Sequence, residues 1–265
     1  GDALTVRFVE TSPVLRTHQQ TAIMASGIAA TWHEAFDDIP VRADVPAIII
    51  GNEFFDALPI RQFERGDHGW SERLVGVDAD SGELGFVRGR ETPVTDALIP
   101  ATLRGSAKKG DIFESCAPAI AIADQVARRL NETHGAALFI DYGHPSSAFG
   151  DTLQALKGHE YHPVLRDPGD ADLTAHVDFA AIARAMNEAG ARTGAVLTQG
   201  TFLRMLGIEQ RAELLKTGAD EQQAVAIDQA LARLVDADQM GTLFKVLIGY
   251  GRETTPPPCV SGVAG

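Results

Sequence analysis

Three polar side chains that could bind a cation follow a short apolar segment: Asn52, Glu53 and Asp56. The segment itself, residues 47–50, is apolar and β-branched, which is typical of a parallel strand buried on both faces. In an open α/β sheet, ligands bind just beyond the carboxyl ends of the strands. The pattern therefore predicts either a polar binding site on an apolar wall or a capped turn at the end of a strand.

A second apolar segment, residues 135–140, ends in the same way, with Asp141, Tyr142 and His144 around a glycine. The carboxyl ends of neighbouring parallel strands meet at one edge of a sheet. If the two segments are neighbours, their polar ends face one cleft. The repetition favours a binding site over two unrelated capped turns.

Carboxylates in such a cleft suit the guanidinium group, whose planar fork of N–H donors they bind in bidentate fashion. To alkylate a guanidinium, an enzyme must orient one nitrogen lone pair toward an electrophilic carbon and stabilise the delocalised charge. Glu53 and Asp56 would supply the acid groups, and Phe54 and Phe55 the aromatic surface. The first chemistry that the sequence favours is therefore group transfer to a bound cation.

Other chemistries have weaker support in the sequence. His159 and His162 are three residues apart, and His176 and Asp178 would share one face of a strand. No recognised metal-ligand spacing accompanies them, so we expect solvated histidines and no metal. The sequence contains no G-x-S-x-G nucleophile motif, no G-x-G-x-x-G loop and no Walker-type loop.

Composition narrows the class of partner. The formal net charge of −13 over 265 residues disfavours nucleic acid and anionic membranes and suits a basic ligand or protein segment. Two cysteines, Cys116 and Cys259, favour a reducing compartment. No apolar run approaches the length of about 18 residues that a transmembrane helix needs, so no membrane insertion is expected.

Alternation and capping patterns predict the elements that would position these residues. Strands are expected at residues 4–9, 47–50, 111–114, 135–140 and 243–248, with a short strand or loop at 31–34. Helices are expected at residues 13–26, 117–131, 179–189, 201–218 and 222–235. A β-hairpin is predicted at residues 73–87, with its turn at Asp80-Ser81-Gly82. Residues 150–178 are unusually polar and predict a long excursion near the cleft.

Seven blocks of sequence resemble one family: VETSPVLRTHQQ (9–20), GNEFFDALPIRQF (51–63), GAALFIDYGH (135–144), GDTLQALKGH (150–159), DPGDADLTAHVDF (167–179), TQGTFLRMLGI (198–208) and MGTLFKVL (240–247). They occur in the family's order and span nearly the whole chain. On these blocks the chain resembles the MidA-like S-adenosylmethionine-dependent methyltransferases, whose mitochondrial members are respiratory complex I assembly factors.

The resemblance implies a fold: the α/β class I methyltransferase (Rossmann-like) architecture. This is a seven-stranded, mostly parallel sheet with helices on both faces. Here it would carry a β-hairpin insertion at about 61–110 and a polar loop/helix excursion at about 145–178. The methyltransferase domain would span residues 1–253, with a disordered tail at 254–265. The family's first strand and glycine-rich cofactor loop should lie upstream of Val9, so we expect the domain to lack both.

The resemblance also implies roles for the candidate residues. Glu10, at the end of the second strand of the fold, would hold the cofactor ribose, with Ser12 and Asn52 beside the cofactor. Glu53 resembles the first glutamate of the two-glutamate guanidinium clamp of protein arginine methyltransferases. The second glutamate is not matched, because Gln62 stands nine residues on. Asp56, Glu64, Asp141 or a residue of the excursion would substitute; Phe54, Phe55, Tyr142 and His144 would contact the substrate.

The implied function is transfer of a methyl group from S-adenosylmethionine to an arginine of a basic protein, such as a complex I subunit. Two alternatives remain: a methyltransferase-fold assembly or binding protein without catalysis, and methylation of a small molecule. The expected compartment is the bacterial cytoplasm, or the mitochondrial matrix if the source is eukaryotic. A chain without the glycine-rich loop would transfer little or no methyl.

Overall fold

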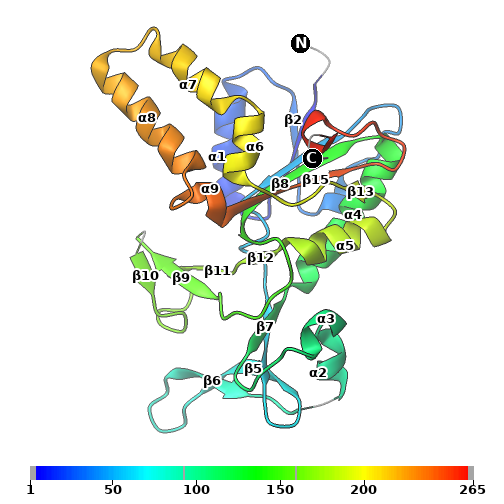
Figure 1. Ribbon diagram of the computed structural model, residues 1–265, viewed down its shortest axis with the longest axis vertical. Helices are drawn as coiled ribbons and strands as arrows, with labels where there is room; N and C mark the ends of the chain where they lie inside the picture. Colours follow the sequence, from blue (N-terminus) through cyan, green and yellow to red (C-terminus); the bar gives the residue numbers. More distant parts are fainter. Residues whose placement is uncertain (1–3, 92, 159, 262–265) are drawn as a thin grey trace.

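The computed structural model describes residues 4–91, 93–158 and 160–261, and its central sheet is built around strand β8, Ala136–His144 (Figure 1). Strands β3 (Ile48–Asn52) and β12 (Val177–Asp178) pair with β8 in parallel. Strand β15 (Phe244–Tyr250) pairs with β8 antiparallel, and β13 (Arg192–Thr193) and β14 (Leu197–Thr198) pair with β15. The sheet is therefore mixed.

Helices cover both faces of this sheet. Successive side chains of β8 point to opposite faces, so each face has apolar side chains on which a helix can pack. Phe139 and its neighbours face α4 (Ala117–Thr133) and α5 (Phe179–Glu188), in a core that includes Leu130, Ile182 and Leu247. Leu138 and Ile140 face the other way, toward Phe202 of α6 (Gln199–Met205). The predicted helices at 117–131 and 179–189 are confirmed.

The predicted helix at 201–218 is divided in the structure. Gly207 adopts a positive φ of 81° between α6 and α7 (Ile208–Lys216), a conformation that ends a regular helix. The predicted helix at 222–235 is confirmed as α8 (Glu221–Val235), which begins with a capping box at Asp220. Helix α9 (Met240–Leu243) leads into β15.

The prediction of one seven-stranded, mostly parallel sheet is not what the described residues form. Strands β1 (Val6–Val9) and β2 (Ala30–His33) make a separate parallel pair, connected through α1 (Pro13–Met24). The predicted burial of 47–50 on both faces is also wrong. Ile48 and Ile50 are 81% and 67% exposed, because only the opposite face of β3 packs on the core.

The insertion at 61–110 is an antiparallel sheet in the order β6-β5-β4-β7, which includes the predicted hairpin. Its strands are β4 (Arg61–Arg65), β5 (Trp70–Val77), β6 (Leu84–Arg88) and β7 (Ile112–Ser115). Helices α2 (Pro93–Leu98) and α3 (Ala101–Arg104) accompany it. Phe63, Trp70, Ile99 and Phe113 give this sheet a small core of its own.

The excursion at 145–178 is a three-stranded sheet of β9 (Gln154–Lys157), β10 (Glu160–His162) and β11 (Asp172–Thr174), where loop and helix were predicted. His159 lies outside the described residues. Elsewhere, a 3₁₀ turn spans Phe36–Asp38, and α10 (Pro258–Ser261) lies in the predicted tail, of which 262–265 are outside the described part. Within the described residues, no helix is long and apolar enough to cross a membrane.

Candidate functional site

The two polar strand ends predicted from the sequence come together, because β3 and β8 are hydrogen-bonded neighbours. Asn52 lies opposite Ile140 in the parallel register, so Glu53 and Asp141 follow side by side. The Glu53 amide continues the ladder by donating to the Ile140 carbonyl at 2.9 Å. The expectation that the two polar strand ends are neighbours is thus confirmed.

Asp141 lies beneath this edge, with only 1% of its surface exposed. Its Oδ2 accepts the backbone N–H groups of Phe54, Phe55 and Asp56 at 3.1, 3.0 and 3.2 Å, and its Oδ1 accepts its own neighbour's N–H, that of Tyr142, at 2.9 Å. Three successive amides thus converge on one carboxylate oxygen from 85 to 87 residues away in sequence. The contacts are those of a group that holds the turn 53–56 against β8.

Burial and the negative charge of Asp56 raise the pKa of Asp141 to about 7, while the backbone donors oppose the rise. Asp56 itself is 7% exposed and accepts the hydroxyl of Tyr142 on Oδ2 at 2.5 Å. Burial and this hydrogen bond raise the pKa of Tyr142. The Oδ1 atom of Asp56 is buried and has no hydrogen-bond partner among the described residues.

Glu53 is the exposed acid of the group, and its backbone is strained. Its φ of 47° lies in the left-handed region, which a residue with a side chain adopts at a cost of about 1–2 kcal/mol. Such strain persists where surrounding contacts over-determine the backbone, and the three amides bound to Asp141 do so here. The Asn52 amide donates to Glu53 Oε1 at 3.3 Å, so the two side chains point the same way.

The predicted aromatic contacts divide between surface and core. Phe54 is 36% exposed beside Glu53, whereas Phe55 is buried against Phe139 with ring centroids 4.9 Å apart. The Nδ1 of His144 lies 3.2 Å from the carbonyl oxygen of Val177. Phe54 is therefore the aromatic side chain that a bound molecule would meet first at this edge.

The predicted cofactor residues Glu10 and Ser12 lie at the end of β1, where their side-chain hydrogen bonds are local, while the Glu10 amide donates to His33 of β2 at 3.0 Å. Glu10 accepts the Ser12 amide on Oε1 at 2.8 Å and the Gln19 side chain on Oε2 at 3.1 Å. Ser12 caps α1 by accepting the Leu15 amide at 3.3 Å. Within the described part of the chain, neither residue bonds to the strand-end group around Glu53.

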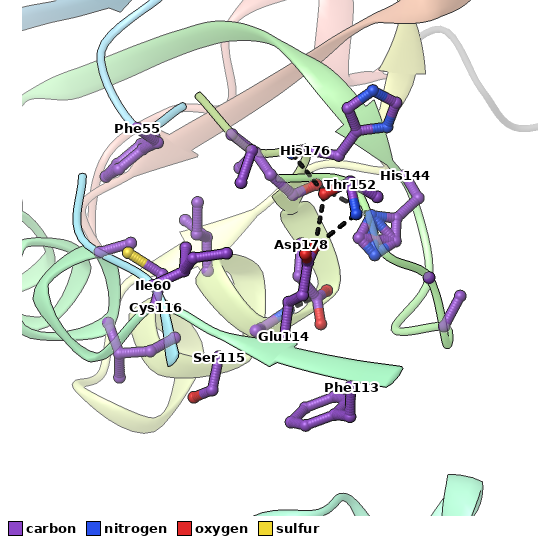
Figure 2. Close-up of a pocket in the computed structure, with 18 of the residues that line it drawn as sticks. Phe55, Ile60, Phe113, Glu114, Ser115, Cys116, His144, Thr152, His176 and Asp178 are labelled. Carbon is purple, nitrogen blue, oxygen red and sulfur yellow. Dashed lines mark hydrogen bonds between the residues drawn. The ribbon is translucent and has the colours of Figure 1, made fainter. Parts of the chain in front are cut away.

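A pocket of about 310 Å³ adjoins the strand ends, and the sequence did not predict it (Figure 2). It shares Phe55 and His144 with the site, and its apolar lining includes Ile60 and Phe113. Burial lowers the pKa of its His176, and the charge of His144 lowers it further. The figure shows both histidines on one side of the pocket, and Phe55, Ile60 and Cys116 on the other. Its lining comes from β7, α4, the segment after β8, and β12–α5, so only the folded chain assembles it.

Glu114, in this pocket, is the centre of a polar network that contains Gln62. The Gln62 amide donates to Glu114 and to Asp151, each at 2.8 Å, and the amides of Thr152 and Leu153 also donate to Glu114. The position that would carry the second clamp glutamate is therefore buried in a network that joins β4, β7 and the excursion. The contacts made by Gln62 gave no signal in the sequence.

The histidines that raised the question of a metal lie apart in the fold. His162 Nε2 approaches Asp167 at 3.3 Å in the excursion, whereas His176 lies edge-on to Tyr142 with ring centroids 5.6 Å apart. Across residues 4–91, 93–158 and 160–261, no three His, Cys, Asp or Glu side chains form a group that could hold a metal ion.

Comparison with known proteins gives a consistent set of relatives. The model of a family described as "putative S-adenosyl-L-methionine-dependent methyltransferase" matches residues 1–196. Two mitochondrial proteins named protein arginine methyltransferase NDUFAF7, from Danio rerio and Xenopus tropicalis, are 33% and 34% identical to this chain. These alignments cover 92% and 99% of this chain but 56% and 59% of the relatives, so the chain spans a little over half their length.

Two crystal structures of proteins from Burkholderia thailandensis have the same fold over 97% of this chain. An uncharacterised superfamily member is 29% identical with a TM-score of 0.82, and the match covers 68% of its chain. A second member of that superfamily, bound to S-adenosyl-homocysteine, is 26% identical with a TM-score of 0.80, and 66% of its chain is covered.

Proposed function

Because the chain belongs to this family of S-adenosyl-L-methionine-dependent methyltransferases, we propose that it methylates arginine side chains of a basic protein. The observation that carries the proposal is the exposed carboxylate of Glu53, held at the joined ends of β3 and β8 by the amides bound to Asp141. The names of the relatives and the net charge of −13 support a basic protein as the acceptor.

Glu53 would act by binding and orienting the guanidinium. Its carboxylate would accept two N–H groups of the arginine, which leaves a terminal nitrogen free to attack. The cofactor supplies an electrophilic methyl group on a sulfonium. The nitrogen lone pair would form the new N–C bond as the S–C bond breaks, and the nitrogen would then lose one proton to solvent. No covalent intermediate with the protein is needed, so orientation is the main contribution of the site.

Asp56 is the carboxylate we propose as the second partner of the guanidinium. Its Oδ1 has no partner among the described residues, and it lies three residues from Glu53 on the same turn. The other candidates have other contacts: Glu64 pairs with Arg88 at 3.2 Å in the insertion, and Asp141 is committed to the turn amides. Asp56 is 93% buried, so the guanidinium would reach it only by entering the cleft.

The cofactor would lie between β1 and β3, with Glu10 at its ribose. We propose that full binding needs a strand and a glycine-rich turn between these two strands. The pairing of β3 supports this, since in the described sheet β3 bonds to β8 alone and its other edge is free for such a strand. Calorimetry with S-adenosylmethionine tests it: this chain should bind weakly, and a longer protein that includes the strand should bind more tightly. Equal affinity of the two proteins would contradict the proposal.

The names of the relatives, which state protein arginine methylation and a mitochondrial location, bear on the acceptor and the compartment. We propose a respiratory complex I-type subunit as the methylated protein, in the mitochondrial matrix if the source is eukaryotic and in the cytoplasm if it is bacterial. The pocket beside the strand ends would bind an apolar side chain of that acceptor next to the arginine.

Transfer of label from S-adenosylmethionine to candidate basic subunits tests the activity in the full-length protein. Glu53→Gln keeps the shape of the side chain but removes its charge, so turnover should fall by at least about a hundredfold while the fold and cofactor affinity remain. Glu188→Gln, an exposed glutamate near the end of α5, is the matched control and should retain activity.

Two outcomes would count against the proposal. Full activity of the Glu53→Gln protein would remove Glu53 from the chemistry. Intact cofactor binding without label transfer to any basic protein or peptide would favour a small-molecule acceptor or a binding protein that keeps the fold without catalysis.

A further inference from the structure

The hairpin of β5 and β6 carries apolar side chains on both of its faces. Val75 and Val77 on β5 are 54% and 68% exposed, and they lie on the same face as Leu84 and Phe86 of β6. Leu74 and Val87 are exposed on the opposite face. Beyond Arg73, where its pairing with β4 ends, β5 forms with β6 a two-stranded ribbon that is exposed on both faces. Such a ribbon alone is only marginally stable in water, so we expect this surface to have a partner.

The outer edge of β6 is free to pair with another strand. In the described sheet β6 bonds to β5 alone. Two hydrogen bonds fix which residues of this segment face β5. The Gly89 amide donates to the Glu72 carbonyl at 2.7 Å, and the Asp78 amide donates to the Glu83 carbonyl at 2.8 Å, so the backbone groups of Glu83 and Gly89 point toward β5. Since backbone groups alternate along an antiparallel strand, the N–H and C=O groups of Leu84, Phe86 and Arg88 point outward. The edge carries no lysine, proline or bulge of the kinds that block strand addition.

Charge is distributed unevenly along this edge. The turn before β6 contains Asp78, Asp80 and Glu83. The other end of the strand contains Arg88, which also pairs with Glu64 at 3.2 Å, and Arg90, which is followed by Glu91. An antiparallel partner of the same sequence would place the acidic turn of each hairpin beside the basic end of the other. A parallel partner of the same sequence would place like charges together.

We propose that two copies of this chain associate through their β6 edges, antiparallel, about a two-fold axis at Phe86. Phe86 is the central residue of β6 and points its backbone groups outward, as a self-paired residue on a two-fold axis must. In this register Gly85 faces Val87 of the partner subunit, and nothing within 4 Å of its missing side chain obstructs the approach. The two insertion sheets become one continuous sheet.

A second copy accounts for the edge better than other occupants do. The pairing satisfies the outward backbone groups and the charge gradient of both copies at once, and it brings the apolar side chains of the two β6 strands side by side. Figure 1 places the hairpin at the end of the molecule opposite the β1–β2 pair. The surface is thus separate from the exposed face of β3, and the inference does not depend on the proposed methyl transfer.

Sedimentation velocity of the full chain over a range of concentrations tests the association. The unmodified protein should sediment as a dimer, and Phe86→Glu should be a monomer with an unchanged circular dichroism spectrum. Leu214→Glu, at a residue 70% exposed on α7, is the matched control and should remain dimeric. A monomeric unmodified protein, or a Phe86→Glu protein that is still dimeric, would overturn the proposal.

Charge exchange distinguishes this register from unspecific association of apolar surfaces. One variant carries Asp80→Lys and Glu83→Lys, and the other carries Arg88→Glu and Arg90→Glu. Each variant alone places like charges at both ends of the interface and should dimerise at least tenfold more weakly than the unmodified protein. Mixed in equal amounts, the two should form a heterodimer, because both ends then become complementary. Self-association of either variant as strong as that of the unmodified protein would show an unspecific or differently oriented contact.

Discussion

Two strand ends in this protein carry a glutamate with a predicted role, and they are held in different ways. The turn after β3 is tied to β8 by the three amides that Asp141 accepts across 85 to 87 residues of sequence. At the end of β1, the side chain of Glu10 accepts hydrogen bonds from Ser12 and Gln19, which lie within nine residues, and its backbone amide donates to His33 of β2 at 3.0 Å. The β3 turn thus depends on the packed core, whereas the β1 end depends on its own helix and on β2.

The difference has a consequence for function. Glu53 can remain in a strained backbone conformation because the buried carboxylate beneath it fixes the turn. Glu10 has no comparable support in the described residues, and β1 and β2 do not join the central sheet. A group that must orient an acceptor is best placed on the rigid turn after β3. The β1–β2 pair is the part of the protein that the proposed additional strand would order.

Removing the carboxylate of Asp141 should have the largest effect. Asp141→Ala leaves four N–H groups, those of residues 54–56 and of Tyr142, without their acceptor, and at about 1–3 kcal/mol each the free energy of unfolding should fall by about 4 kcal/mol or more. Chemical denaturation measures it. Asp124→Ala, at a carboxylate on α4 that is 40% exposed and pairs with Arg128, is the control and should change stability by less than about 1 kcal/mol. A small loss at Asp141 would mean that local contacts fix the turn.

The pH dependence of stability should carry the signature of the same group. The pKa of Asp141 is about 7 in the folded chain, against about 3.9 for an unperturbed aspartate. Between these values the folded chain retains a proton that the unfolded chain has released, so stability falls as pH rises from about 4 to 7. The total loss in the free energy of unfolding over this pH range is at most about 4 kcal/mol. Denaturation at successive pH values measures it, and the slope should be absent in Asp141→Asn.

The comparison also shows which features the sequence could reveal. The two apolar strands with polar ends at Glu53 and Asp141 were predictable, because a buried strand has a short and distinctive composition. The three amides bound to Asp141 were not, since backbone donors leave no trace in side-chain identity. The pocket and the Gln62–Glu114 network join segments far apart in the chain, and no local pattern encodes their approach.

The failed fold predictions have physical causes of the same kind. Three successive isoleucines in β3 look the same whether one face or both are buried, so the exposure of Ile48 and Ile50 could not be predicted. The polar composition of 150–178 suggested loop, but short antiparallel strands need few apolar residues when cross-strand hydrogen bonds hold them. Gly207 divides a continuous helical pattern through backbone conformation alone.

Relieving the strain at Glu53 should have a smaller effect, and of opposite sign. Glu53→Gly removes the side chain that disfavours a φ of 47°, so stability should rise by up to about 1 kcal/mol. Methyl transfer by the full-length protein should be lost at the same time. Denaturation and label transfer together measure this trade of stability for function. A destabilised glycine variant would mean that side-chain contacts of Glu53 outweigh its backbone strain.

The smallest effect is expected at the locally held strand end. Ser12→Ala removes the oxygen that caps the Leu15 amide, which costs about 1 kcal/mol or less at this exposed position. Because the contacts there are local, faster hydrogen exchange should be confined to α1 and β1 and should not reach residues 53–56. Hydrogen exchange read by mass spectrometry measures this. Faster exchange at both strand ends would show that the β1–β2 pair and the central sheet behave as one cooperative unit, and would contradict the separation on which the comparison rests.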